Sequence, residues 1–369
     1  MKTTWSIKRI GDVCEIRTGA NQKAVESSDG KYPIYGSGGP MGFAKEYRCP
    51  AQTVLIGRKG TLNNPILVQT PCWNIDTAYG LISKEMLLPA YLFYFCRNTD
   101  FTTLDPDSGR PSTKSTSIAK IQIPLPPLSE QERIVGILDA AFEKIDKLQR
   151  NAERNLANVK VLFQQVLDEK MKPREDWKIA TFKDLFDVRD GTHDSPKYHS
   201  HGHPLITSKN LKTGVLDYNN VKLISEEDFI KINERSKVDR LDLLFAMIGT
   251  IGNPIVVENE PDFAIKNVAL FKNSKNQNMF FLKYLLNSSM VHNRMIKDAQ
   301  GSNQKFVGLA YLRNFQTPYP PLQAQDTIVK ELDLVSNYCT KLSHFYRRQI
   351  EECAELKQQV LIQVFNGEL

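Results

Sequence analysis

The sequence predicts an α+β protein in which two similar mixed α/β domains are separated by a pair of long antiparallel coiled-coil helices and related by a rough two-fold rotation. Three observations lead to this prediction: the length of 369 residues, an internal duplication, and two long stretches whose apolar residues recur every 3.5 residues. We expect the first domain over residues 1–127, its helix over 128–171, the second domain over 172–321 and its helix over 322–369.

The internal duplication consists of segments that match in the same order along the chain. The offset between the matching segments only grows, from 172 to 194 residues, so the second copy carries an insertion of about 17 residues between Ile206 and Gly249. Several matches in one order do not arise by chance. The matching segments are Trp5–Gly19 with Trp177–Gly191, Gly60–Val68 with Gly249–Val257, Leu92–Tyr94 with Leu282–Tyr284, and Pro124–Leu128 with Pro318–Leu322.

Short apolar runs between Gly, Asn and Pro turns predict strands in both globular parts, at Thr53–Ile56, Ile66–Val68 and Ile255–Val257. Longer apolar patches predict helices at Leu87–Arg97 and Met279–Asn287. The polar segment Lys172–Asp176 ends the first long helix and leads into the second copy.

Each long helix follows a Pro-Pro pair. In the first copy Ser129 precedes Glu132 by three residues, which predicts a capping box at the helix start. Apolar residues then alternate in steps of four and three, the period of a coiled-coil seam. Roughly 40 residues at about 1.5 Å each make a rod of about 60 Å, whose seam needs a partner helix. The predicted seam residues are Ile134, Leu138, Ile145, Leu148, Asn155, Val159 and Leu162 in the first helix, and Ile328, Leu332, Val335, Leu342, Gln349 and Leu356 in the second.

The overall composition is that of an ordinary globular protein, with 41% hydrophobic and 24% charged residues. No run approaches the ~18 apolar residues of a membrane span, so we expect no membrane partner and a cytoplasmic location. The six cysteines are scattered, which suits reduced, structural thiols. The net charge of +6 suits a polyanionic partner without demonstrating one.

No catalytic motif is found. The chain has no GxxxxGK[ST] loop, and its Pro-Pro pairs are followed by Leu rather than by the aromatic residue of amino-methyltransferases. The glycines of 36–39 suit a phosphate loop or a flexible turn, and the turn is favoured because no suitable strand precedes them. His199, His201 and His203 suit a zinc site or a polar loop facing DNA; without a fourth ligand in register we predict no metal and no cofactor in this chain.

Contact with nucleic acid is better supported, because loops in both copies carry cations, amides and hydroxyls, the groups that contact phosphates and base edges. Each such loop alone is more typical of plain surface, and the recurrence in both copies is what favours DNA. The candidate residues are Lys23, Tyr35, Ser37, Arg58, Lys59, Thr61, Arg110 and Lys114 in the first copy, and His193, Lys197, Lys209, Asn210, Thr250, Asn303, Gln304 and Lys305 in the second.

The pattern resembles the specificity (S) subunit of type I restriction-modification systems, and the resemblance covers the whole chain. It depends on the Trp5 and Trp177 openings and on three phrases, IPLPPLSEQERIVGILDAAFEKIDKL, TPYPPLQAQDTIVKEL and LKQQVLIQVFNGEL, of which the first two start the long helices and the third ends the second one.

The resemblance implies a non-catalytic subunit whose two target-recognition domains each read one half of a split sequence in double-stranded DNA. It also implies two methyltransferase subunits docked on the helices, which supply S-adenosylmethionine and methylate adenine, and restriction subunits in the full complex. Two other classes stay open: a stand-alone DNA-modifying enzyme and a coiled-coil adaptor that binds only proteins.

The polar seam positions Asn155 and Gln349 lie 194 residues apart, at the same place in each copy. They are either chance polar residues at a helix edge or residues that fix the helix register at some cost in stability. If they fix the register, replacing both by Leu raises the melting temperature and loosens the pairing. Thermal unfolding together with DNA binding tests this; unchanged register and binding in the double variant would refute the register role.

Overall fold

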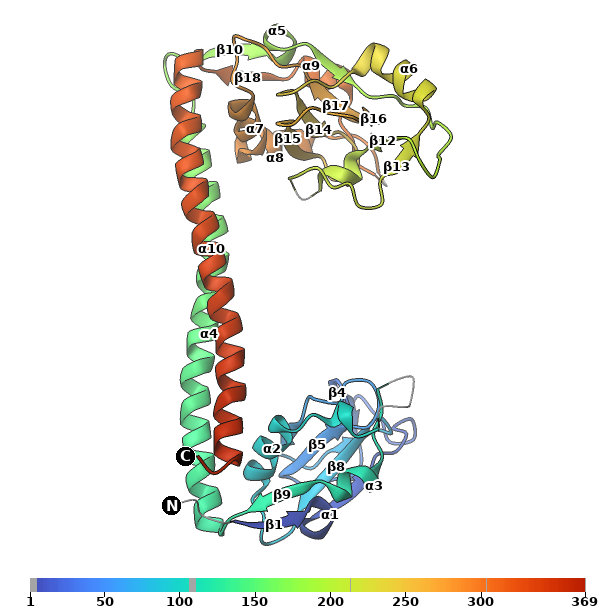
Figure 1. Cartoon of the computed structure of the whole chain (residues 1–369), viewed down its shortest axis with the longest axis vertical. Helices are drawn as coiled ribbons and strands as arrows, with labels where there is room; N and C mark the ends of the chain where they lie inside the picture. Colours follow the sequence, from blue (N-terminus) through green and yellow to red (C-terminus); the bar gives the residue numbers. More distant parts are fainter. Residues whose placement is uncertain (1–4, 106–110, 213, 303, 369) are drawn as a thin grey trace. The chain divides into compact units, whose positions relative to one another are not determined.

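The computed structural model describes residues 5–105, 111–212, 214–302 and 304–368, which form two compact units. The first unit contains the residues up to 154 together with those from 346 onward, and the second contains residues 155–345. Each unit therefore holds one globular domain and parts of two long helices, α4 (Leu128–Lys170) and α10 (Leu322–Phe365), which Figure 1 labels.

The first domain is built on a four-stranded sheet in the order β2-β8-β5-β6, a three-stranded sheet β4-β3-β7, and the ribbon β1-β9. Its strands are β1 (Ser6–Arg9), β2 (Cys14–Thr18), β3 (Tyr32–Gly36), β4 (Gly39–Ala44), β5 (Thr53–Gly57), β6 (Ile66–Val68), β7 (Trp73–Asn74), β8 (Ala78–Ser83) and β9 (Gln122–Leu125). Its short helices are α1 (Ile10–Val13), α2 (Pro89–Asn98), the 3-10 turn η1 (Phe101–Thr103) and α3 (Ser115–Lys120).

The second domain repeats this plan, with sheets β11-β17-β14-β15 and β13-β12-β16 and the ribbon β10-β18. Its strands are β10 (Lys178–Thr181), β11 (Val188–Asp190), β12 (His203–Ile206), β13 (Lys222–Ile224), β14 (Leu243–Ala246), β15 (Gly252–Val256), β16 (Ala264–Ile265), β17 (Val268–Phe271) and β18 (Gln316–Tyr319). Its helices are α5 (Phe182–Leu185), η2 (Ser208–Leu211), α6 (Glu226–Ser236), α7 (Met279–Asn287), α8 (Ser289–Asp298) and α9 (Leu309–Arg313).

The equal strand orders confirm the duplication, and α6 lies inside the insertion that the sequence predicts. The predicted strands correspond to β5, β6 and β15, and the predicted helices to α2 and α7. All five residues of β5 are buried, which explains its continuous apolar run. α2 buries Tyr91 and Leu92 in the core of the first domain, and α7 buries Phe281 and Leu282 in that of the second.

The two long helices begin in the same way, and the predicted capping box is wrong. α4 starts at Leu128, so Ser129 lies inside its first turn and not at the N-cap. The Pro127 carbonyl accepts the amide protons of Glu130 and Gln131, and the Pro321 carbonyl accepts those of Ala324 and Gln325.

A buried glutamine in the first turn fixes each long helix to its own domain. Gln131 accepts a hydrogen bond from the Leu88 amide at 2.8 Å and donates two, at 2.9 Å each, to the carbonyls of Met86 and Pro126. Gln325 likewise accepts from the Asn278 amide at 2.8 Å and donates to the Pro320 carbonyl at 2.9 Å. The Asn278 amide precedes α7 as the Leu88 amide precedes α2, so both copies use the same joint.

A tyrosine–aspartate hydrogen bond is also present in both copies, about two helical turns after the glutamine. The Tyr94 hydroxyl donates to Asp139 at 2.5 Å, and the Tyr284 hydroxyl donates to Asp333 at 2.6 Å. Burial and the neighbouring carboxylate raise the pKa of both phenols above the usual value, so they stay protonated donors. With the glutamine, this pair sets the direction in which each helix leaves its domain.

Within each unit α4 and α10 pack side by side in antiparallel fashion (Figure 1). In the first unit the Lys357 ammonium lies 2.6 Å from the Asp146 carboxylate and donates to Gln149 at 3.0 Å. In the second unit Lys170 lies 2.5 Å from Glu331. The fold class predicted from the sequence, two similar domains with long antiparallel helices, is confirmed.

The buried face of each long helix has a different phase from the predicted seam, and near the helix ends the globular domains help to cover it. On α4, buried or half-buried residues recur in ten steps over 36 residues, or 3.6 residues per step, and the residues 194 positions later on α10 are also buried or half-buried. This is the period of a straight α-helix rather than the 3.5 of the predicted coiled coil. The α4 positions are Gln131, Ile134, Leu138, Phe142, Ile145, Gln149, Ala152, Leu156, Val159, Phe163 and Leu167.

Part of the predicted seam is therefore wrong. Ile134, Leu138, Ile145, Val159, Ile328 and Leu332 are buried, and Asn155, Val335 and Gln349 are half-buried. Leu148, Leu162, Leu342 and Leu356 instead have exposed fractions of 56%, 48%, 39% and 44%. The displaced leucines leave apolar side chains on the outer faces of both helices, at positions that correspond between the copies.

The shifted seam predicts unequal effects for two leucines of one helix. Leu138→Ala removes a fully buried side chain and is expected to cost about 2–5 kcal/mol of unfolding free energy. Leu148→Ala, at an exposed site, is expected to change it by no more than about 0.5 kcal/mol. Urea unfolding of both variants measures the difference. Equal losses of unfolding free energy would contradict the observed burial and favour the 3.5-residue seam predicted from the sequence.

Candidate nucleic-acid interface

The turn between β5 and β6, residues 57–61, carries three of the candidate residues of the first domain. Gly60 has a φ of +81°, which favours glycine, and a Cβ at Gly57 would lie 2.0 Å from the Thr61 carbonyl oxygen. These two glycines make the turn tight, and Lys59 and Thr61 are exposed on it.

This turn is hydrogen-bonded to a distant segment that precedes α3. The Gly60 amide donates to the Pro111 carbonyl at 3.1 Å, the Thr113 amide donates to the Arg58 carbonyl at 2.9 Å, and Lys59 pairs with Ser112 in an antiparallel bridge. We call residues 58–60 paired with 111–113, and their equivalents in the second domain, the loop ladder. It brings Lys114 to the basic turn.

Arg58 is held in place from several sides. Its amide donates to the Thr77 carbonyl at 2.8 Å, its Nη1 donates to the Asp76 carbonyl at 3.2 Å, and its guanidinium lies 5.8 Å from the centre of the Tyr79 ring. A guanidinium held by a main-chain carbonyl and a ring face loses little freedom when it binds, and among the described residues its other N–H groups have no hydrogen-bond partner.

Two further segments complete this surface. The Ser37 amide donates to the Thr77 hydroxyl at 3.3 Å, and the Ser37 hydroxyl lies 3.5 Å from the Cβ position of Gly60. The Lys114 side chain is 77% exposed, and its ammonium lies 3.7 Å from Asp105. Ser37, Arg58, Lys59, Thr61 and Lys114 therefore gather on one loop surface.

The remaining candidates of the first domain lie elsewhere. Tyr35 is half-buried and packs on a small cluster that includes Cys49 and Cys72, so packing is its main role in this structure. Lys23 is exposed on a separate turn, in which its own main-chain amide donates to the Asn21 side chain. Arg110 lies outside the described residues. The glycines of 36–39 form the tight turn between β3 and β4, as predicted.

The second domain has the same loop ladder, formed by residues 247–249 with 305–307. The Gly249 amide donates to the Lys305 carbonyl at 2.9 Å, the Val307 amide donates to the Met247 carbonyl at 3.0 Å, and Ile248 pairs with Phe306. Gly249 has a φ of +78°, nearly that of Gly60. The predicted Thr250, Gln304 and Lys305 are exposed beside it, and Asn303 lies outside the described residues.

His193 belongs to a polar cluster that the sequence did not reveal as a whole. Its ring nitrogens lie 2.8 Å from the Asn267 amide oxygen and 2.9 Å from the buried Asp190 carboxylate, which also pairs with Arg235. Lys266 donates to the Ser195 hydroxyl at 2.5 Å. A sequence signal for Asn267 exists: in the alignment of the two copies it occupies the place of Thr77, directly before an inner strand.

Lys197 and Lys209 are exposed, but Asn210 is buried, so its prediction as a DNA-contacting residue is wrong. Its side chain is only 7% exposed, accepts hydrogen bonds from the amide and hydroxyl of Thr207, and donates to the Asp217 carbonyl at 2.8 Å. Asn210 therefore caps the η2 turn, and its amide is not available to a DNA base.

The three histidines considered for a zinc site, His199, His201 and His203, have different partners in the structure. His199 pairs through its backbone with Leu223, and His201 contacts the Ser200 hydroxyl. His203, on β12, lies 2.6 Å from Glu226 and 2.8 Å from Asp262, and its ring stacks on Phe229 at 4.0 Å. Among the described residues no group of three or more His, Cys, Asp or Glu is arranged to hold a metal.

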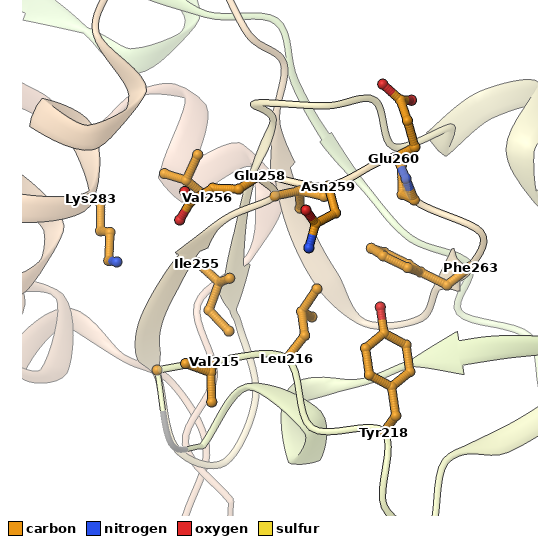
Figure 2. A pocket seen from close by; sticks show the side chains of 13 residues that line it. Val215, Leu216, Tyr218, Ile255, Val256, Glu258, Asn259, Glu260, Phe263 and Lys283 are labelled. Carbon is orange, nitrogen blue, oxygen red and sulfur yellow. The ribbon is translucent and has the colours of Figure 1, made fainter.

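A hollow of about 330 Å³ in the second domain lies near the end of β15 that is remote from residues 247–250. Figure 2 shows Leu216, Tyr218 and Phe263 lining it, with Glu260 pointing away. Its lining is largely apolar or acidic, and it does not connect to the loop ladder.

The six cysteines are buried free thiols, and burial raises the pKa of Cys14 to about 12.

A family model described as the type I restriction modification DNA specificity domain matches residues 2–155 and 174–352. The chain belongs to this family. The two matched ranges are the two copies of the duplication, so the resemblance inferred from the sequence is confirmed. No helix among the described residues is long and apolar enough to cross a lipid bilayer.

Relatives in this specificity family cover most of the chain. The EcoBI specificity subunit of Escherichia coli is 22% identical over 86% of this chain and 74% of its own length. The MjaVIII specificity subunit of Methanocaldococcus jannaschii is also 22% identical, over 86% of this chain and 76% of its own.

Solved structures show the same fold. A chain from a type I R-M system has a TM-score of 0.79 at 19% identity and covers 100% of this chain and 99% of that chain. The HsdS subunit from Thermoanaerobacter tengcongensis has a TM-score of 0.62 at 19% identity and covers 100% of this chain and 98% of that one.

His203 predicts a pH dependence of the second domain. The hydrogen bond to Glu226, and then Asp262, raise the pKa of His203 above its usual 6.5. A raised folded-state pKa stabilises the fold below pH ~6.5, and this contribution is lost as pH rises through the folded pKa. Glu226, the partner of His203, is the first residue of α6. We therefore expect amide hydrogen exchange in α6, corrected for the intrinsic exchange rate, to become faster as pH rises through the folded-state pKa of His203.

The matched variants are His203→Gln, which removes the titrating ring, and His201→Gln, which changes an exposed histidine of the same segment. The pH-dependent opening of α6 is expected to vanish in the first and to persist in the second. Persistence in both would remove His203 as its source.

Proposed function

We propose that this chain is the DNA-reading subunit of a type I restriction-modification complex, in which each globular domain reads one half of a bipartite target. The single observation that supports this best is the loop ladder, which recurs in both domains with the same hydrogen bonds and the same turn glycine. A rigid main-chain frame that carries exposed cations, hydroxyls and amides is suited to phosphates and base edges.

In this proposal catalysis lies in partner subunits. Two methyltransferase subunits bind S-adenosylmethionine and methylate adenine, and restriction subunits join the full complex. The chain itself is non-catalytic and works in the cytoplasm, where its DNA substrate lies. The family membership, the names of the relatives and the solved type I R-M system chain support these roles.

The outer faces of α4 and α10 are the proposed docking surface for the methyltransferase subunits. Leu148 and Leu342 occupy corresponding positions and are both exposed, as are Leu162 and Leu356. Apolar side chains exposed twice at equivalent places suit two copies of one partner, because each copy of the repeat offers the same contact.

The paired helices are the proposed spacer between the two reading domains. If the domains meet the major groove about one helical turn apart, ~10 base pairs between centres, and each reads ~3–4 base pairs, a gap of ~6 unread base pairs follows. The buried joints at Gln131 and Gln325 support this role, since a spacer needs rigid connections at both ends.

Salt dependence and partner requirement test the proposal as a whole. The chain with methyltransferase subunits is expected to bind its target duplex with an affinity that falls steeply with salt, in proportion to the phosphates it neutralises. A coiled-coil adaptor would not bind DNA. A stand-alone enzyme would methylate or cleave DNA without added subunits, so an active isolated chain would contradict the proposal.

The spacer role predicts the effect of a matched insertion in both helices. Seven residues added to each of α4 and α10 at facing positions lengthen the pair by about 10 Å, or about 3 base pairs. Methylome sequencing is expected to show a longer gap between unchanged half-sites. The control replaces seven residues of each helix without a change in length; altered half-sites in the insertion variant would refute the spacer role.

A further inference from the structure

The loop ladder has the same backbone in both domains but opposite side-chain chemistry. Two inter-loop hydrogen bonds and one bridging pair coincide, and the turn glycines have φ values of +81° and +78°. The side chains on this frame differ at every bridging position. Arg58 corresponds to Met247, Lys59 to Ile248, Ser112 to Phe306 and Thr113 to Val307.

In the first domain the loop ladder and the residue that follows it carry three cations. Lys59 and Lys114 are exposed, and Arg58 is half-buried with its guanidinium held by the Asp76 carbonyl and the Tyr79 ring. A planar guanidinium in a fixed position suits the O6 and N7 acceptors of guanine in the major groove. Mobile lysine ammoniums suit phosphates instead.

In the second domain the bridging positions are apolar, and the exposed Lys305 flanks them. Phe306 is 38% exposed, and its amide and carbonyl both bond to Gln300 at 2.9 Å, so it is held between two neighbouring segments. Ile248, its bridging partner, is half-buried. An exposed phenylalanine held in place by its main chain suits contact with the 5-methyl group of thymine.

We propose that the loop ladder is the base-reading element of both domains, with Arg58 reading a guanine in one half-site and Phe306 with Ile248 reading a thymine methyl in the other. This inference rests on the proposed function. It adds which residues determine specificity and predicts that the two half-sites are chemically unlike each other.

The test uses the full chain with its methyltransferase subunits on the target found by methylome sequencing. Each guanine is replaced in turn by 7-deazaguanine, which lacks the N7 acceptor, and each thymine by uracil, which lacks the methyl group. One deazaguanine is expected to weaken binding by about 5- to 150-fold. One uracil, in the other half-site, is expected to weaken it by about fourfold.

Variants then assign each effect to a residue. Arg58→Met places the second domain's residue at this position and removes every guanidinium donor, so we expect the deazaguanine effect to vanish. Lys59→Ala, the neighbour on the same turn, is expected to lower the salt slope by about one and to keep the deazaguanine effect. Phe306→Ala is expected to abolish the uracil effect alone. Because the ladder is formed by main-chain groups, none of these changes removes its hydrogen bonds, and melting temperatures verify folding.

A residue with a merely structural role would weaken binding to natural and analogue duplexes by the same factor, and that outcome would overturn the proposal. A target without guanine in either half-site would overturn the assignment of Arg58. By contrast, an absence of sequence-specific methylation by the unmodified complex would refute the proposed function itself.

Discussion

The buried glutamine at the first turn of each long helix is the contact on which the arrangement of each unit depends. Gln131 and Gln325 are buried, and each satisfies a main-chain amide ahead of α2 or α7 and the carbonyl before a proline. A buried amide side chain that lost these partners would leave several polar groups unsatisfied, so the joint is costly to bend. It makes each helix a rigid extension of its own domain.

The duplication, the main strands and the long helices were predictable from the sequence. Each depends on local signals: the apolar runs of β5 and β6, the proline pairs before the helices, and the order of matching segments. The glutamines were visible as the last letter of the phrase P-x-P-P-L-x-x-Q that both copies share, but their role was not. Polar contacts between a helix start and a segment some 45 residues away leave no periodic trace in the sequence.

The errors have physical causes. A seam read from a 3.5-residue alternation of mainly apolar residues chose Leu148 and Leu342, whereas the helices bury Phe142 and half-bury Gln149. Asn210 looked like a surface amide until the fold buried it as a turn cap. Candidate loops were recognisable by composition, but the ladder that joins residues more than 50 positions apart follows from the tertiary fold.

In the loop ladder, the main chain holds the two segments together, while the side chains are available for contacts with a ligand. The hydrogen bonds that both copies share involve only main-chain atoms, and each turn has a glycine with positive φ, Gly60 or Gly249. Side chains on such a frame are free to change without refolding the domain, as the arginine, lysine, methionine and isoleucine at matching places already illustrate. Retargeting to a new sequence is then open to natural variation and to protein engineering through a few point substitutions, with the rest of the subunit left as it is.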